Sequence, residues 1–171
     1  SVFFSNDVFS NEKIISKLKK GEKIIFIRHS LAPGNGDPKN FELNDCNSQR
    51  NLNFKGIEQS KKIGEFFIQN NIPIDVVLSS EWCRCKDTAR HAFGEFKTFK
   101  ALNSFYDEKF YKFKDKQIKD LNNYIKKWKS DKNLVLVTHY VVINELLKIG
   151  AQSSELIITD KNLNIIDRIL F

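Results

Sequence analysis

Methionine is absent from this chain of 171 residues, which begins at Ser1. We therefore expect its natural start to be missing, through a cleaved leader or a trimmed sequence, and the cytoplasm and the periplasm both stay open as compartments. No signal peptide is visible, and no apolar run approaches the ~20 residues that span a bilayer. The sequence thus predicts a protein without a membrane span.

Cysteine is too scarce for a disulfide scaffold, since the chain has three. Cys46 lies in a polar stretch, while Cys83 and Cys85 flank Arg84. Two interpretations stay open. The three thiols are inert, or Cys46 pairs with Cys83 or Cys85, which ties the polar stretch to Arg84 and indicates an oxidising compartment. A zinc site is disfavoured, because only His91 could join the cysteines and no ligand pair has zinc spacing. We expect no metal or other cofactor.

The net charge of +7 comes mostly from lysine, much of it spread through residues 109–132. A basic surface attracts phosphorylated ligands, nucleic acid or anionic membranes. Lysines spaced in this way are typical of a solvated helix face. Because the chain has no arginine-rich arm and no zinc-finger or RNA-binding signature, we expect no nucleic-acid partner. The length fits one domain over residues 1–171, which we expect to be a monomer.

Apolar runs and turn signals predict alternating strands and helices. Residues 31–51 are polar and read as a long loop, and residues 101–113 are aromatic and ambiguous. The expected strands span 23–28, 75–78, 95–99, 134–137, 155–160 and 163–170. The expected helices run from a Ser10 cap to Gly21 and over 55–70, 84–93, 115–129 and 140–149. This alternation indicates an α/β fold of three layers, with a mostly parallel central sheet and helices on both faces.

Three of the expected strands end in polar groups of the same kind. Arg-His-Ser follows the first at 28–30, Ser-Ser at 79–80 leads to Arg84, and Thr-His follows a later strand at 138–139. The carboxyl ends of parallel strands lie on one edge of a sheet, so two arginines and two histidines are expected to converge there. Arginine forks match phosphate oxygens, and a neutral imidazole can attack phosphorus.

Each of these motifs also has a plain structural explanation when taken alone. An Arg-His pair at a strand end is commonly structural. Thr138 and His139 fit a helix cap with a surface histidine. Arg84 has Asp87 within reach on its own helix. The functional interpretation therefore depends on all the motifs occurring together and in order.

Four motifs in the same order resemble those of the histidine phosphatase superfamily, which has the phosphoglycerate-mutase-like fold. The superfamily's Arg-His-Gly is Arg-His-Ser here at 28–30, and its Thr-His-Gly is Thr-His-Tyr at 138–140. Its Ser-Ser-Pro-Leu-x-Arg-Ala-x-x-Thr-Ala corresponds to residues 79–89, which keep both serines, the arginine and Thr-Ala. Its Arg-Leu-Gly segment is similar to residues 50–56. The resemblance covers nearly the whole chain and is to the small single-domain phosphatases.

The resemblance implies roles for five residues. His29 is the nucleophile that becomes phosphohistidine, Arg28, Arg84 and His139 complete the phosphate pocket, and Arg50 is a further anion contact. It implies a metal-independent phosphatase acting on a phosphorylated small molecule or a phosphoprotein. The alternative is a non-catalytic domain of the same fold that binds phosphorylated ligands. A mutase is disfavoured, since the superfamily's mutases are longer and keep a glutamate as proton donor.

That glutamate is the main departure from the superfamily pattern. The matching stretch, residues 102–104, reads Leu-Asn-Ser, with Ser104 where the acid is expected. Asp107 is our preferred substitute because it lies in the same loop, and Glu108 and Glu81 are alternatives. Without an acid, the site is expected to favour substrates whose leaving groups depart unaided.

Two smaller departures concern the mouth of the pocket. Ser30 and Tyr140 stand where the superfamily has glycine, and both are expected to narrow the opening. The loop at 33–49 is expected to form part of the substrate rim, with a plain surface loop as the alternative.

Overall fold

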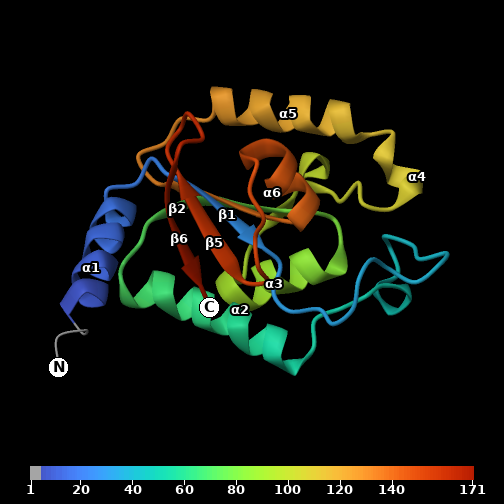
Figure 1. The fold of residues 1–171 in the computed structure, drawn as a ribbon, viewed down its shortest axis with the longest axis horizontal. Coiled ribbons are helices and arrows are strands. Elements are labelled where there is room, and N and C mark those ends of the chain that lie inside the picture. Colours follow the sequence, from blue (N-terminus) through green and yellow to red (C-terminus); the bar gives the residue numbers. More distant parts are fainter. Residues whose placement is uncertain (1–4) are drawn as a thin grey trace.

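The computed structural model describes the backbone of residues 5–171 and the side chains from residue 11 onward. Its centre is a six-stranded sheet with the strand order β3-β2-β4-β1-β5-β6 (Figure 1). The first four strands along the chain are parallel to one another, and β5 runs antiparallel between β1 and β6. The strands are β1 (Ile24–Arg28), β2 (Ile74–Ser79), β3 (Lys97–Thr98), β4 (Asn133–Thr138), β5 (Glu155–Thr159) and β6 (Ile165–Leu170).

Helices cover both faces of this sheet (Figure 1). One core cluster joins α1, α2 and α3 to one face, and a second cluster joins α5 and α6 to the other. The expected three-layer α/β architecture is therefore confirmed. The helices are α1 (Ser5–Lys19), α2 (Phe54–Gln69), α3 (Cys83–Phe93), α4 (Glu108–Tyr111), α5 (Lys114–Lys127) and α6 (Tyr140–Leu147).

The apolar run of β1 is explained by its central position between β4 and β5. Ile25 and Ile27 belong to the cluster under α2 and α3, while Ile24 and Phe26 belong to the cluster under α5 and α6. All four side chains are fully buried. A strand covered on both faces has no solvent side, so its sequence is apolar without alternation.

Two glycines bring α2 close to its neighbours. A Cβ at Gly56 would lie 2.2 Å from the carbonyl oxygen of Leu31, and one at Gly64 would lie 2.1 Å from that of Ala92. Any larger residue would therefore push α2 away from α3 and from the chain that follows β1. The glycine of the Arg50 segment thus serves close packing beside the carboxyl end of β1.

Most helix and strand boundaries lie within two residues of the sequence expectation, and the main differences lie in the first helix, in β3 and in residues 101–113. The first helix extends back to Ser5, so the backbone of Ser10 lies inside the helix and not at its start, while the side chain of Ser10 lies outside the described residues. The strand expected over 95–99 is only Lys97–Thr98. The ambiguous stretch 101–113 contains the short helix α4, preceded by a 3₁₀ turn at Lys100–Leu102. None of the helices in the described part of the chain has the length and apolar character needed to cross a membrane.

Candidate active site

The carboxyl ends of β1, β2 and β4 meet at one edge of the sheet. Arg28 is in register with Thr138, and the ladder continues one step further through a 3.0 Å hydrogen bond from the His29 backbone N to the Thr138 carbonyl. A cleft of about 290 Å³ opens at this edge. It is lined by Arg28, His29, Asn35, Gly36, Arg50, Arg84, Ser104, Tyr106, His139, Tyr140 and Val141.

His29 is buried, with 2% of its surface exposed, and its ring is held in one tautomer. Its Nδ1 lies 2.9 Å from the carbonyl oxygen of Ser30, which accepts only from a protonated nitrogen. Its Nε2 accepts from the Nε of Arg84 at 3.3 Å. Both contacts require the proton on Nδ1 and leave the Nε2 lone pair unprotonated. Burial, reinforced by the positive charge of Arg84, holds the pKa of His29 well below 6.5.

His139 lies beside His29, with 5.6 Å between the ring centroids. Its Nε2 is 2.8 Å from the hydroxyl of Ser80, the residue that follows β2. Burial and the charge of Arg84 also hold the pKa of His139 well below 6.5. The Cys85 sulfur lies 3.5 Å from the same Nε2, and burial raises the pKa of this thiol to about 12. Both histidines are therefore neutral at pH 7, and Cys85 is an unreactive thiol.

Arg28 and Arg50 have carbonyl oxygens, not carboxylates, as partners. Arg28 Nη1 donates to the Ala151 carbonyl at 2.7 Å, and its buried Nε has no hydrogen-bond partner among the described residues. Arg50 donates from Nε to the Gly36 carbonyl at 2.6 Å. The pKa of both arginines is lowered by burial and by the positive charge of Arg84. Their charges are thus not neutralised by an acid, which suits the cleft to an anion.

Arg84 pairs with an acidic residue that the sequence analysis missed. Its Nη1 donates to Asp37 Oδ1 at 2.8 Å, and the two side chains are only 4% and 5% exposed. The expected alternative, a pair between Arg84 and Asp87 on their own helix, is wrong, because Asp87 pairs with Arg90. The only signal of Asp37 in the sequence was its place in the loop expected to form the rim.

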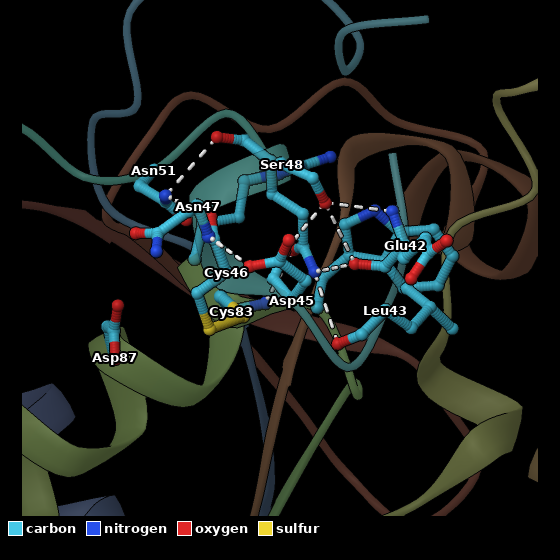
Figure 2. Close-up of a disulfide and its surroundings, with 12 residues drawn as sticks. Glu42, Leu43, Asp45, Cys46, Asn47, Ser48, Asn51, Cys83 and Asp87 are labelled. Carbon is cyan, nitrogen blue, oxygen red and sulfur yellow. Dashed lines mark hydrogen bonds between the residues drawn. A yellow bond between two sulfur atoms is a disulfide. The ribbon is translucent and has the colours of Figure 1, made fainter. Parts of the chain in front are cut away.

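A disulfide joins this loop to the start of α3, and it is the Cys46–Cys83 pair (Figure 2). Beside it, the Asn51 side chain donates to the Cys46 carbonyl at 2.7 Å, and the Gln49 side chain accepts from the Cys83 backbone N at 3.0 Å. Cys85 is the buried free thiol. The loop is therefore tied to the residue next to Arg84 by a covalent bond and by hydrogen bonds.

A family model described as the histidine phosphatase superfamily (branch 1) matches residues 24–110. The chain belongs to this superfamily. No curated protein matches it in sequence.

Solved structures of the superfamily's fold cover most of the chain at low sequence identity. The protein histidine phosphatase SixA, in a complex with tungstate, has a TM-score of 0.59 and 14% identity, over 86% of this chain and 96% of that one. A putative alpha-ribazole-5'-P phosphatase from Escherichia coli has a TM-score of 0.62 and 14% identity, over 82% and 91%. A phosphoserine phosphatase from Entamoeba histolytica, in a complex with 3-phosphoglyceric acid, has a TM-score of 0.58 and 18% identity, over 80% and 89%.

The superfamily pattern assigns phosphate contacts to five residues. All five line the same cleft: Arg28, His29, Arg50, Arg84 and His139. Two further expectations about the cleft hold in part. Asn35 and Gly36 of the loop 33–49 line it, and so does Tyr140. Ser30 does not narrow the mouth, because its side chain is fully buried within 2.7 Å of the Ser60 hydroxyl.

The structure does not bring Asp107 into the cleft of this superfamily member. Its carboxylate accepts from the Lys109 backbone N at 3.0 Å and caps α4. Glu81 bonds the Asn103 side chain instead of lining the cleft, and Glu108 is exposed. Ser104 does line the cleft, and none of the described lining residues is Asp or Glu. Asp107 lies outside the cleft because its carboxylate caps α4, whose first backbone amides need an acceptor.

A larger and more open hollow of about 1190 Å³ lies between the ends of α2 and α3 and beside β2. Its lining is mostly apolar and contains none of the superfamily's motif residues. Size alone would favour this hollow, but convergent arginines and histidines occur only at the smaller cleft among the described residues. The smaller cleft is therefore the candidate active site.

Proposed function

We propose that this chain is a metal-independent phosphatase that hydrolyses phosphomonoesters through a phosphohistidine on His29. The observation that carries the proposal is the state of His29, a neutral imidazole whose Nε2 lone pair lies in a cleft with three arginines. A nucleophile without a proton needs no base to activate it, and the guanidinium groups supply the positive charge that a phosphoryl group needs.

The reaction has two steps. When the phosphoryl group binds, Arg84 Nε exchanges its hydrogen bond to His29 Nε2 for one to a phosphoryl oxygen, which frees the Nε2 lone pair. His29 Nε2 then attacks phosphorus in line with the leaving oxygen, so that an N–P bond forms while the P–O bond breaks. Arg28, Arg50 and Arg84 hold the non-bridging oxygens. The oxygen of a water molecule then attacks phosphorus, so that a P–O bond forms while the N–P bond breaks. The products are inorganic phosphate, a proton and neutral His29. His139 is proposed to hydrogen-bond the same oxygens.

The lining of the cleft also favours a class of substrate. Because no carboxylate lines it among the described residues, the leaving oxygen has no obvious proton donor. General acid catalysis contributes about 10²–10⁴-fold, so alkyl phosphates would lose this factor. Aryl phosphates, acyl phosphates and phosphoramidates lose less, and we propose that the substrates belong to this group. They include phosphorylated small molecules and phosphoproteins.

The test is turnover of 4-nitrophenyl phosphate by wild type and by His29→Ala, which is expected to lose at least about 10³-fold in kcat. His91→Ala is the matched control, because His91 is exposed on α3 outside the cleft, and it is expected to keep full activity. A phosphoprotein trapped from wild type in alkali, and absent from His29→Ala, would identify the intermediate.

A domain that binds phosphorylated ligands without turnover is the competing function, favoured by the missing acid. It predicts that wild type binds tungstate, the oxyanion in the SixA complex, but does not hydrolyse 4-nitrophenyl phosphate. That result would reject the phosphatase proposal and leave the anion site intact.

A further inference from the structure

We propose, on the basis of the function proposed above, that Asp37 is a positioning residue that holds Arg84 in the geometry that binds the phosphoryl group. Its carboxylate lies outside the cleft lining, so it acts through the arginine and not on the substrate. Three properties of Asp37 support this role: its negative charge, the burial of its side chain and its hydrogen bonds.

Three donors converge on the Asp37 carboxylate. Arg84 Nη1 donates to Oδ1 at 2.8 Å and the Arg50 backbone N to the same oxygen at 3.0 Å, while Trp82 Nε1 donates to Oδ2 at 3.0 Å. Trp82 is 1% exposed, so it is a rigid reference point for the carboxylate. Asp37 therefore connects Arg84 and Arg50, which both line the cleft, to the buried Trp82.

The contact also fixes the orientation of the Arg84 guanidinium. One edge is held by Asp37 at Nη1, and the Nε on the same side chain donates to His29 Nε2 at 3.3 Å. The contact to His29 is released when the Nε2 lone pair attacks phosphorus, and the Asp37 contact then keeps the guanidinium in its plane. Because Arg84 also contacts the His29 nucleophile, a shift of Arg84 would disturb binding and attack together.

Asp37 belongs to a segment that the fold holds only at a few points. The segment from residue 31 to residue 53 contains one 3₁₀ turn, Cys46–Ser48, and one isolated bridge. Its attachments include the Cys46–Cys83 disulfide (Figure 2), the buried ring of Phe41 against Trp82, and Asp37. The Gln49 side chain, which accepts from the Cys83 backbone N, is a further one. Arg84 Nη1 bonds this segment at the Asp37 carboxylate, at 2.8 Å, and more weakly at the Arg50 carbonyl, at 3.5 Å.

The experiment is a double-mutant cycle with tungstate binding measured by calorimetry. Asp37→Asn, nearly the same size but uncharged, is expected to weaken binding at least about tenfold in the wild-type background. In the Arg84→Ala background the same change is expected to cost less than about twofold, because the residue through which Asp37 acts is gone. Equal losses in both backgrounds, or no loss in either, would overturn the inference.

Asp87→Asn is the matched control, since it breaks an exposed ion pair on α3 outside the cleft and is expected to leave binding unchanged. Near-ultraviolet circular dichroism checks that the Trp82 environment is native in each variant. If Asp37→Asn does not fold, Asp37→Glu, which keeps the charge, goes through the same cycle with the same expected coupling.

The cycle distinguishes this inference from the proposed function. It uses binding, so coupling between Asp37 and Arg84 is measurable even if wild type turns over no phosphate ester. A wild type that binds no tungstate would overturn the anion site and the role of Asp37 together. If wild type is active, kcat/KM for 4-nitrophenyl phosphate is expected to follow the same coupling pattern.

Discussion

Individual side chains in the cleft are held in states that suit nucleophilic attack on phosphorus. The carbonyl oxygen of Ser30 and the guanidinium of Arg84 each require the same tautomer of His29. Burial and neighbouring cations then disfavour protonation, which is why the pKa of His29 lies well below 6.5. The nucleophile that we propose thus needs no separate base to activate it at neutral pH.

Ser104 is the residue whose identity should decide which leaving groups are accepted. Ser104 lines the cleft, and the resemblance to the superfamily assigns a glutamate to its position. We therefore expect kcat/KM for 4-nitrophenyl phosphate to exceed that for glycerol phosphate by at least about 10²-fold. A series of phenyl phosphates should give rates that fall as the pKa of the leaving phenol rises. Equal rates for the aryl and alkyl esters would contradict the hypothesis.

Asp107→Asn is the companion variant for that comparison. Since the Asp107 carboxylate caps α4 instead of lining the cleft, the substitution should change neither rate by more than about twofold. A selective loss of glycerol phosphate turnover would instead identify Asp107 as the missing acid.

At the scale of elements, the segment 31–53 is the part of the site that regular structure does not hold. The helices and strands around it pack through two large apolar clusters, whereas this segment depends on a disulfide, the buried ring of Phe41 and polar contacts. Its attachment at Cys83 is adjacent in sequence to Arg84. A change in the segment should therefore reach the anion site directly.

Removal of the disulfide should loosen the segment and weaken the anion site. The bridge closes a loop across 37 positions, for which the chain-entropy model gives about 4 kcal/mol of stabilisation. We expect Cys46→Ser to lower the free energy of unfolding by about 2–4 kcal/mol and to raise KM for 4-nitrophenyl phosphate several-fold. Urea unfolding and steady-state kinetics measure the two effects.

Reduction of the wild type with dithiothreitol should reproduce the kinetic change and speed proteolysis within 31–53. The control is Cys85→Ala, which keeps the bridge and should respond to dithiothreitol as the wild type does. An unchanged KM after complete reduction would show that the other contacts suffice to hold the segment.

At the scale of the whole molecule, two buried neutral histidines should make stability depend on pH. In the unfolded chain each takes up a proton near pH 6.5, whereas in the folded chain His29 and His139 resist protonation until much lower pH. Below pH 6.5 the unfolded state therefore binds more protons, and stability falls as pH falls. The slope approaches about 1.4 kcal/mol per pH unit for each histidine.

Urea unfolding between pH 5 and pH 8 measures this dependence. We expect a plateau above pH 7 and a decline below about pH 6.5, and His29→Ala should reduce the slope by about half. A free energy of unfolding that stays constant from pH 8 to pH 5 would show that the two rings accept protons in the fold.

Much of the architecture could be predicted because it depends on local patterns. The apolar strands and the amphipathic α2 and α5 lie within a few residues of their expected places. The meeting of His29 and His139, which are 110 positions apart, also followed from strand ends alone. Parallel strands put their carboxyl ends on one edge, so a polar residue just after each strand has a predictable position.

The sequence by itself determined the three-layer arrangement and the place of the polar residues at the ends of β1, β2 and β4. It could do so because buried positions on helices and strands recur at regular spacings in the sequence. Only the tertiary structure decided that Asp37 pairs with Arg84, that Cys46 bonds Cys83, and that Asp107 lies away from the cleft. These contacts depend on the path of irregular segments. In such segments no repeating pattern relates a residue's position in the sequence to the direction of its side chain. They are set by long-range packing, such as the buried Trp82 that fixes the Asp37 carboxylate.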